Sequence, residues 1–233
     1  MTPASTSTDG IDRQTDDVLL FDMDGVILEG WGTSSEVHSR ALDDVLSNRE
    51  IEVNGDLRAA LDSYEYTDEF EAACQQLGVD PLEFYHAREV RSENRAIERL
   101  AAGSRGLCPD TDVLEQLATA LPLGIVSNNY DRTVEFVVDH FRLESVSFAR
   151  GRDVGAEGFH QRKPDPHYLN EALDELDATG GFYVGDRASD VIAAERAGLD
   201  SVFIRRDHNA SLELAVEPTV EIERLTELQS LVE

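Results

Sequence analysis

Short apolar runs alternate with segments of helical periodicity over much of this sequence. Residues 18–21 form an apolar run that ends at a polar turn, which is typical of a buried strand. Similar runs recur later in the chain, at 123–126, 146–148, 182–184 and 201–204. Apolar residues at helical spacing lie between these runs, over 113–120, 131–141, 165–176 and 188–197.

The ends of the predicted helices carry local signals. Asp131 can cap the helix that follows it, and Gly198 can end the last one. Asp165 and Pro166 can open the helix before that. Strands that alternate with helices imply a parallel sheet covered on both faces. The sequence therefore predicts an α/β fold with a Rossmann-like parallel sheet.

Strand signals almost vanish between residues 34 and 102. Asp80 followed by Pro81 is typical of a helix start. Apolar residues recur there at helical spacing in three groups: Val37, Ala41, Val45 and Leu46; then Phe70, Ala73, Cys74 and Leu77; then the long segment 81–100. We therefore expect an all-helical insertion after the first strand.

These patterns divide the chain into three parts. We expect an α/β core made of residues 18–29 and 106–233, with a helical cap domain over 30–105 inserted into it. Residues 1–17 are rich in Ser, Thr and Asp and are expected to be a flexible tail. The glycines of the segment 29–32 make it the expected hinge into the cap.

Charge narrows the range of partners. The 233 residues include 48 Asp and Glu against 20 Lys and Arg, a formal net charge of −28. Such a field repels nucleic acid and anionic lipid, so neither is an expected partner. All but one of the basic residues are arginine, and this composition resembles that of cytosolic proteins from salt-accumulating halophiles. We therefore expect a dependence on salt, which screens the repulsion.

Location and assembly are less constrained. Cys74 and Cys108 are too few and too far apart for a disulfide framework, so we expect reduced thiols. The sequence shows no stretch typical of a membrane span or signal peptide, and we expect a cytoplasmic protein. Monomer and homodimer both stay open.

Polar side chains follow the predicted strands at one edge of the sheet. Asp22 and Asp24 come after the first strand, and Ser127 with Asn128 comes after the second. The segment 185–190 follows the fourth strand, and the only lysine, Lys163, follows the third. Because the carboxyl ends of parallel strands meet at one edge, we expect these groups to share a pocket.

The first pair of acids suggests covalent chemistry. Asp22 and Asp24 are two residues apart, so in an extended chain both carboxylates face the same side. One acid can then act as nucleophile while the other moves protons. A pair of turn-forming or helix-capping acids is the structural alternative, and the strand before the pair favours function.

The second pair of acids suggests a metal. Asp186 and Asp190 are four residues apart, and with Asp22 they would form a site of hard oxygen ligands, which suits Mg²⁺ better than zinc. Asp190 could instead serve only the start of a helix. Carboxylates gathered in one pocket repel each other without a cation, which favours the metal.

Lys163 and Ser127 could hold an anion beside these acids. The ammonium group of Lys163 can bind a phosphoryl oxygen and the nucleophilic carboxylate together. The hydroxyl of Ser127 and nearby backbone N–H groups can hold a second anionic oxygen. A capping serine and a lysine left by chance are the alternatives when each residue is taken alone.

Taken together, four motifs resemble those of the haloacid dehalogenase-like superfamily of phosphohydrolases. They are the segment 21–26, the segment 126–128, the segment 163–166, and Gly185-Asp186 with Asp190. Segment 221–225 resembles the closing strand and helix of that family, and the helical insertion resembles the cap of its phosphoglycolate phosphatase-like branch.

The resemblance implies a role for each residue. Asp22 would be the nucleophile that forms an aspartyl-phosphate, and Asp24 the general acid and base. Mg²⁺ would be held by Asp22, the backbone carbonyl of Asp24 and Asp186, with Asp190 as a further ligand or a supporting acid. The phosphoryl group would be gripped by Ser127, Asn128 and Lys163. Arg187 stands where the family usually has a small residue, and it could pair with Asp190 or bind substrate.

The cap residues point less clearly to a function. Arg88, Arg91, Arg95 and Arg99 recur at helical spacing and could steer an anionic substrate. We favour a solvated face paired with Glu83, Glu93 and Glu98. Tyr64, Tyr66 and His86 are expected to be packing residues, whereas Trp31 could shade the pocket or pack there.

The expected function is a Mg²⁺-dependent phosphatase for a small phosphorylated metabolite. A phosphosugar mutase similar to β-phosphoglucomutase would share this core and is the main alternative. A 2-haloacid dehalogenase needs no metal and usually lacks the second aspartate, so Asp24, Asp186 and Asp190 argue against it. A binding protein without activity would be expected to have lost one of the key groups, and all are present.

Overall fold

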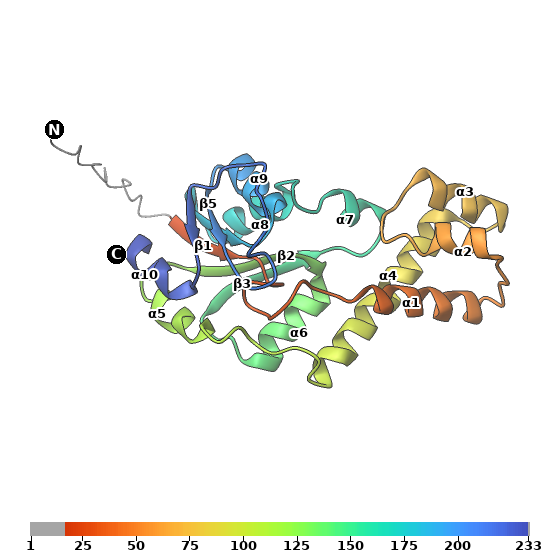
Figure 1. Ribbon diagram of the computed structural model, residues 1–233, viewed down its shortest axis with the longest axis horizontal. Coiled ribbons are helices and arrows are strands. Elements are labelled where there is room, and N and C mark those ends of the chain that lie inside the picture. The colour runs from red at the N-terminus through yellow and green to blue at the C-terminus, as the bar shows by residue number, and fades with distance from the viewer. Residues whose placement is uncertain (1–16, 233) are drawn as a thin grey trace.

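The computed structural model describes residues 17–232 and contains one parallel sheet with helices around it (Figure 1). Six strands pair in the order β3-β2-β1-β4-β5-β6, and every pairing is parallel. The strands are β1 (Asp17–Phe21), β2 (Leu123–Tyr130), β3 (Val146–Arg152), β4 (Gly180–Gly185), β5 (Asp200–Ile204) and β6 (Val220–Ile222). The predicted α/β fold with a Rossmann-like core is confirmed.

Apolar side chains of the strands pack against helices on both faces. Leu19 and Phe21 belong to a cluster on one face that includes residues of α5 (Leu114–Leu117) and α6 (Asp131–Phe141). Val18 and Leu20 point the other way, to a cluster with α8 (His167–Glu175) and α9 (Ala188–Ala197). This alternation is what a strand buried on both faces requires.

The first four helices after β1 pack on each other beside the sheet (Figure 1). They are α1 (Ser35–Asn48), α2 (Gly55–Leu61), α3 (Asp68–Gln76) and α4 (Pro81–Ala101). The side chains of Ser34, Thr67 and Asp80 accept hydrogen bonds from N–H groups of the first turns of α1, α3 and α4. We refer to this helical block as the cap; α2, which is short, was not predicted.

The cap contacts the core through α4 and the loop after β3. Glu89 of α4 forms an ion pair with Arg152 at the end of β3, and both side chains are buried. Phe159 of the short helix α7 (Ala156–His160) packs in the apolar centre of the cap with Phe70 and Tyr85. The cap is therefore held against the core by buried contacts as well as by two linkers, the first over residues 29–34 and the second over residues 102–107.

The arginines of α4 do not form one surface stripe paired with its glutamates, contrary to the sequence interpretation. Arg88 is buried, and its guanidinium donates to the carbonyls of Leu61 and Ser63. Two others, Arg95 and Arg99, pair with acids of α1, namely Asp44 and Glu36. Spacing along one helix could not reveal that the partners lie on a neighbouring helix.

Some predicted boundaries were wrong. The helix expected over 113–120 is a short 3-10 turn, η1 (Thr111–Val113), followed by α5. Asp131 does not cap α6 but is its first residue, and its carboxylate accepts a hydrogen bond from the backbone N–H of Gly151. The closing segment forms β6, η2 (Leu225–Leu228) and α10 (Gln229–Val232).

The expected tail and the two cysteines can also be compared with the structure. The predicted tail lies outside the described residues, except Asp17, which begins β1. Cys74 and Cys108 are free, buried thiols, and burial raises the pKa of each to about 11. Within residues 17–232, no helix is both long enough and apolar enough to cross a membrane.

Candidate active site

The carboxyl ends of β1, β2 and β4 converge with the loop that carries Lys163. Asp22 and Asp24 follow β1 directly, and Asp186 follows β4. Ser127 and Asn128 lie inside β2 rather than after it, because this strand continues to Tyr130 with a shifted register beyond Val126. The convergence expected from the strand order is thus present.

Lys163 lies between two carboxylates. Its Nζ is 3.0 Å from Oδ1 of Asp22 and 2.8 Å from Oδ1 of Asp190, and the side chain is 2% exposed. Nζ also donates to the hydroxyl of Tyr183, which in turn donates to the carbonyl of Val126 at 2.7 Å. Burial disfavours the ammonium form, but Asp190 and Asp22 outweigh it and raise the pKa of Lys163. The lysine is therefore held as a fixed cation.

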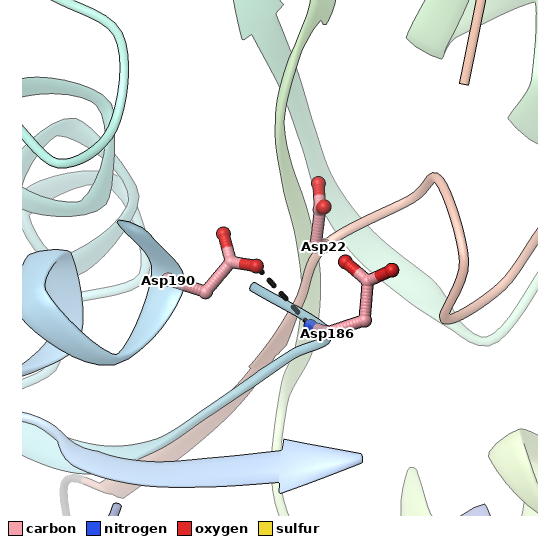
Figure 2. Close-up of side chains that lie close together, drawn as sticks. All are labelled: Asp22, Asp186 and Asp190. Carbon is pink, nitrogen blue, oxygen red and sulfur yellow. Dashed lines mark hydrogen bonds between the residues drawn. The ribbon is translucent and has the colours of Figure 1, made fainter. Parts of the chain in front are cut away.

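Three buried carboxyl groups lie close together (Figure 2), and Lys163 contacts two of them. Asp22, Asp186 and Asp190 each offer an oxygen within 4.8 Å of the others. Asp190 lies in the first turn of α9, where its Oδ2 accepts hydrogen bonds from the backbone N–H groups of Asp186 at 3.2 Å and Arg187 at 3.0 Å. The helix start therefore aims this acid back at the end of β4.

Two glycines make the close approach of these acids possible. Gly25 has a φ of +82°, and a side chain there would overlap the carboxylate of Asp186. Gly185 packs against Asp190 in the same way. Each glycine lies beside an acid that it would displace if it carried a side chain, so both belong to the geometry of the site.

The donor set of this cluster fits a divalent cation. Burial, followed by the charges of Asp22 and Asp190, raises the pKa of Asp186 to about 8. Oδ1 of Asp186 is buried and accepts no hydrogen bond from any residue between 17 and 232. All three groups offer hard oxygen ligands, which Mg²⁺ prefers. A divalent ion would offset the repulsion between the three carboxyl groups and would give Oδ1 of Asp186 a partner.

Asp24 lies apart from the acid cluster and is held by the linkers to the cap. Oδ1 of Asp24 accepts from Arg105 at 2.6 Å, and Oδ2 accepts from the amide of Asn129 at 2.9 Å. The guanidinium of Arg105 also donates to the carbonyl of Glu29 at 2.6 Å. The Asn129 amide lies 3.3 Å from the hydroxyl of Thr33. The carboxylate of Asp24 is thus fixed beside Asp22 without joining the acid cluster.

Asn128 orders the loop that carries the lysine. Its side chain accepts from the backbone N–H of Lys163 at 2.8 Å and donates to the carbonyl of the same residue at 3.0 Å. Ser127 is buried, and its hydroxyl accepts from the N–H of Asn129 at 3.2 Å. Both residues line the cavity over Asp22.

Arg187 bridges the acid cluster and the first linker. Nε of its guanidinium lies 3.7 Å from Oδ1 of Asp186, and Nη2 donates to the carbonyl of Trp31. The guanidinium also stacks on the Trp31 ring, 5.6 Å from its centre. Only its backbone N–H reaches Asp190. The pairing with Asp190 that the sequence suggested is therefore made by the main chain, while the side chain pairs with Asp186.

A cavity of about 300 Å³ lies over these groups, between core and cap. Asp22, Asp24 and Arg187 line it from the core. The first linker and the cap contribute the other wall, with Trp31, Gly32, Thr33, Ser35, His38 and Tyr64. Tyr64 packs on His38 and Phe159, as expected, and also lines the cavity, while Trp31 lies at its edge with half of its surface exposed.

The sequence interpretation missed several residues of this site. Arg105 is one of many arginines and carried no local signal, and His38 lies in an ordinary amphipathic helix. His208, from the loop after β5, places Nε2 2.5 Å from Oδ2 of Asp186. Asn129 belongs to the polar segment expected after the second strand, but nothing in the sequence indicated that its amide would hold Asp24.

Comparison with known proteins identifies the family to which the chain is similar. The sequence pattern of the family described as haloacid dehalogenase-like hydrolase matches residues 17–198. A phosphoglycolate phosphatase from Pectobacterium atrosepticum is 26% identical over 222 residues, which cover 92% of this chain and 91% of that protein. Another, from Pseudomonas fluorescens, is 29% identical over 158 residues, 64% of this chain and 55% of that protein. The match to this second relative thus spans about half of its length.

Among solved structures, CbbY from Rhodobacter sphaeroides, determined in complex with phosphate, is similar with a TM-score of 0.64. The similarity covers 94% of this chain and 99% of that chain at 18% sequence identity. At this identity the likeness concerns the fold.

Proposed function

Because the chain belongs to the haloacid dehalogenase-like hydrolase family, we propose that it is a Mg²⁺-dependent phosphatase that hydrolyses a small phosphorylated metabolite through an aspartyl-phosphate. The named relatives with which it shares most of its length are phosphoglycolate phosphatases, and this supports a phosphate monoester as substrate. Their substrate is one candidate among small phosphate esters.

The pairing of Asp22 with Lys163 is the observation that carries the proposal. A carboxylate at the floor of a cavity, 3.0 Å from a buried ammonium, can attack a phosphoryl group whose charge the same ammonium offsets. A purely structural ion pair would not need a cavity lined by a second acid and a serine hydroxyl.

Two displacements follow from this arrangement. An oxygen of Asp22 forms a bond to phosphorus while the ester P–O bond breaks, and Asp24 gives its proton to the leaving oxygen. Water then attacks the phosphorus of the aspartyl-phosphate and loses its proton to Asp24. The bond between phosphorus and Asp22 breaks, so phosphate leaves and both acids return to their starting states.

Asp22, the backbone carbonyl of Asp24 and Asp186 would hold Mg²⁺, which supplies positive charge against the phosphoryl oxygens. Asp190 is suited to a supporting role, because Lys163 takes one of its oxygens and two backbone N–H groups take the other. Ser127 and Lys163 bind the phosphoryl oxygens, and Asn128 keeps the lysine loop in place.

Hydrolysis of p-nitrophenyl phosphate with and without Mg²⁺ tests the proposal. We expect Mg²⁺ to be required and Asp22→Asn to abolish turnover at nearly constant shape, with circular dichroism as the control for folding. Activity without metal, or near-normal activity of Asp22→Asn, would refute it. Release of halide from a 2-haloacid would indicate a dehalogenase instead. Interconversion of hexose phosphates without phosphate release would indicate a mutase.

We also propose a cytoplasmic location in a salt-rich cell, with small phosphorylated molecules rather than nucleic acid or membranes as partners. The net charge of −28 and the two buried free thiols support this setting. Gel filtration in concentrated salt would decide between monomer and homodimer.

A further inference from the structure

We propose that the cavity over Asp22 accepts the phosphate monoester of a neutral, polyhydroxylated alcohol in preference to that of a hydroxy acid. The inference concerns the alcohol that leaves when the phosphate ester is cleaved, and it rests on the phosphatase activity proposed above. It separates this chain from its named relatives, whose substrate carries a carboxylate next to the phosphate ester.

The wall opposite Asp22 carries no charged side chain among the residues that line the cavity. The first linker and the cap contribute an indole from Trp31, hydroxyls from Thr33 and Ser35, an imidazole from His38 and a phenol ring from Tyr64. Aromatic faces pack against the C–H groups of a polyol, and hydroxyls with an imidazole satisfy its O–H groups. This is the surface that a sugar-like leaving group needs.

His38 is uncharged at neutral pH. Burial, followed by the charge of Arg88, lowers the pKa of His38 to about 4. Its Nδ1 lies 3.2 Å from the hydroxyl of Ser92, and its ring packs on that of Tyr64 with 4.9 Å between centres. The imidazole is therefore a neutral hydrogen-bonding group at the cavity wall and does not supply a cation for a carboxylate.

The arginines near this wall already have hydrogen-bond or ion-pair partners. Arg88 donates to two backbone carbonyls of the cap, and Arg152 pairs with Glu89. At the core side, Arg105 pairs with Asp24. A carboxylate placed against the cap wall would lose water without gaining a cation, which is unfavourable.

Arg187 is the one arginine that lines the cavity among the described residues. It comes from the core, beside the acid cluster, rather than from the cap wall. Its guanidinium donates to the Trp31 carbonyl and faces Asp186. Its charge is thus directed to the acids and the linker. The net charge of −28 also disfavours a substrate with an added negative charge.

Two matched pairs of esters test the inference. Phosphoglycolate and 2-hydroxyethyl phosphate differ by a carboxylate against a hydroxymethyl group, and so do 3-phosphoglycerate and glycerol 1-phosphate. We expect kcat/KM to be at least about tenfold higher for the neutral member of each pair, with Mg²⁺ and concentrated KCl present. Equal values, or a preference for the acids, would overturn the inference.

A variant with a cation in the wall sharpens the test. His38→Arg should shift the kcat/KM ratio toward phosphoglycolate by about tenfold or more. His86→Arg, on an exposed face of α4 outside the cavity lining, adds the same charge to the cap and should leave the ratio unchanged. Ratios are taken within each variant, so partial loss of folded protein cancels. An equal shift in both variants would show a general charge effect and contradict the role of the wall.

The two proposals fail in different ways. If p-nitrophenyl phosphate is not hydrolysed with Mg²⁺, the proposed function is wrong. If it is hydrolysed and the acids are preferred, the phosphatase stands and only the neutral leaving group is refuted.

Discussion

Lys163 has surroundings that suit an ammonium group and would not suit a guanidinium. Its Nζ contacts Asp22 and Asp190 from a buried position, and the Tyr183 ring lies against it, 4.9 Å from Nζ to the ring centre. A guanidinium is longer and planar, so it would have to displace Tyr183 or one of the acids. The single lysine of an arginine-rich chain therefore lies where the two cations differ most in fit.

We predict that Lys163→Arg lowers kcat by about 100-fold or more, because the displaced charge no longer faces Asp22 and the phosphoryl group together. Arg196→Lys is the matched control, since that side chain is exposed and donates to the nearby Pro164 carbonyl. Steady-state kinetics with p-nitrophenyl phosphate measure both. Full activity of Lys163→Arg would make the lone lysine a coincidence of composition.

The lowered pKa of His38 predicts that the stability of the protein depends on pH. Its folded-state pKa of about 4 lies below the ordinary value of 6.5, so the unfolded chain binds a proton first as the pH falls. The free energy of unfolding should therefore decrease between pH 6.5 and 4, by at most about 3 kcal/mol from this residue. Urea unfolding of wild type and His38→Gln at several pH values isolates the effect. A difference between the two proteins that does not change with pH would contradict it.

The two linkers between core and cap hold Asp24, the proposed general acid. Arg105 belongs to the segment after α4, yet it contacts Asp24 and the carbonyl of Glu29 in the first linker. Asn129, at the end of β2, holds the other oxygen of Asp24. The position of the Asp24 carboxylate thus depends on the linkers as well as on β1.

Arg105→Ala should lower kcat about 10- to 100-fold with a smaller change in KM, because Arg105 positions Asp24 and is not among the cavity-lining residues. Arg105→Lys should restore part of the loss. Arg99→Ala removes a surface arginine near the same end of α4, paired with Glu36, and should have little effect. A rise in KM with unchanged kcat would show that Arg105 binds substrate instead.

The elements also show what the sequence could reveal. Strands such as β1 and β4 are short apolar runs followed by polar residues, so the sequence alone could predict them. The order of the four motifs could be read in the same way. The acid cluster could be predicted because its residues lie at or just after the ends of predicted strands. Arg105 and His38 could not be found, since each acts through contacts between segments far apart in the chain. The partners of Arg95 and Arg99 were missed for the same reason, because they lie on another helix.

For the whole molecule, the dominant property is its charge. A net charge of −28 on 233 residues means that carboxylates repel one another across the surface. Salt bridges on the cap, such as Arg40 with Glu36, are exposed and offset little of this repulsion. The compact state should therefore gain stability as salt screens the charges.

We predict that the melting temperature rises steadily with KCl concentration and that activity falls in dilute buffer. Differential scanning calorimetry in KCl, against sucrose at equal osmolality, separates screening from the general effect of a crowded solvent. Full stability and activity in dilute buffer would refute the salt dependence.

If Asp22 is the nucleophile, it carries the phosphoryl group during turnover. The direct measurement is peptide mass spectrometry after rapid acid quench of the enzyme with substrate and Mg²⁺, using Asp24→Asn to slow breakdown of the intermediate. We expect one phosphoryl group on the peptide that contains Asp22, and none when Asp22→Asn is added. Phosphate release without a phosphorylated Asp22, or a phosphoryl group on another residue, would contradict it.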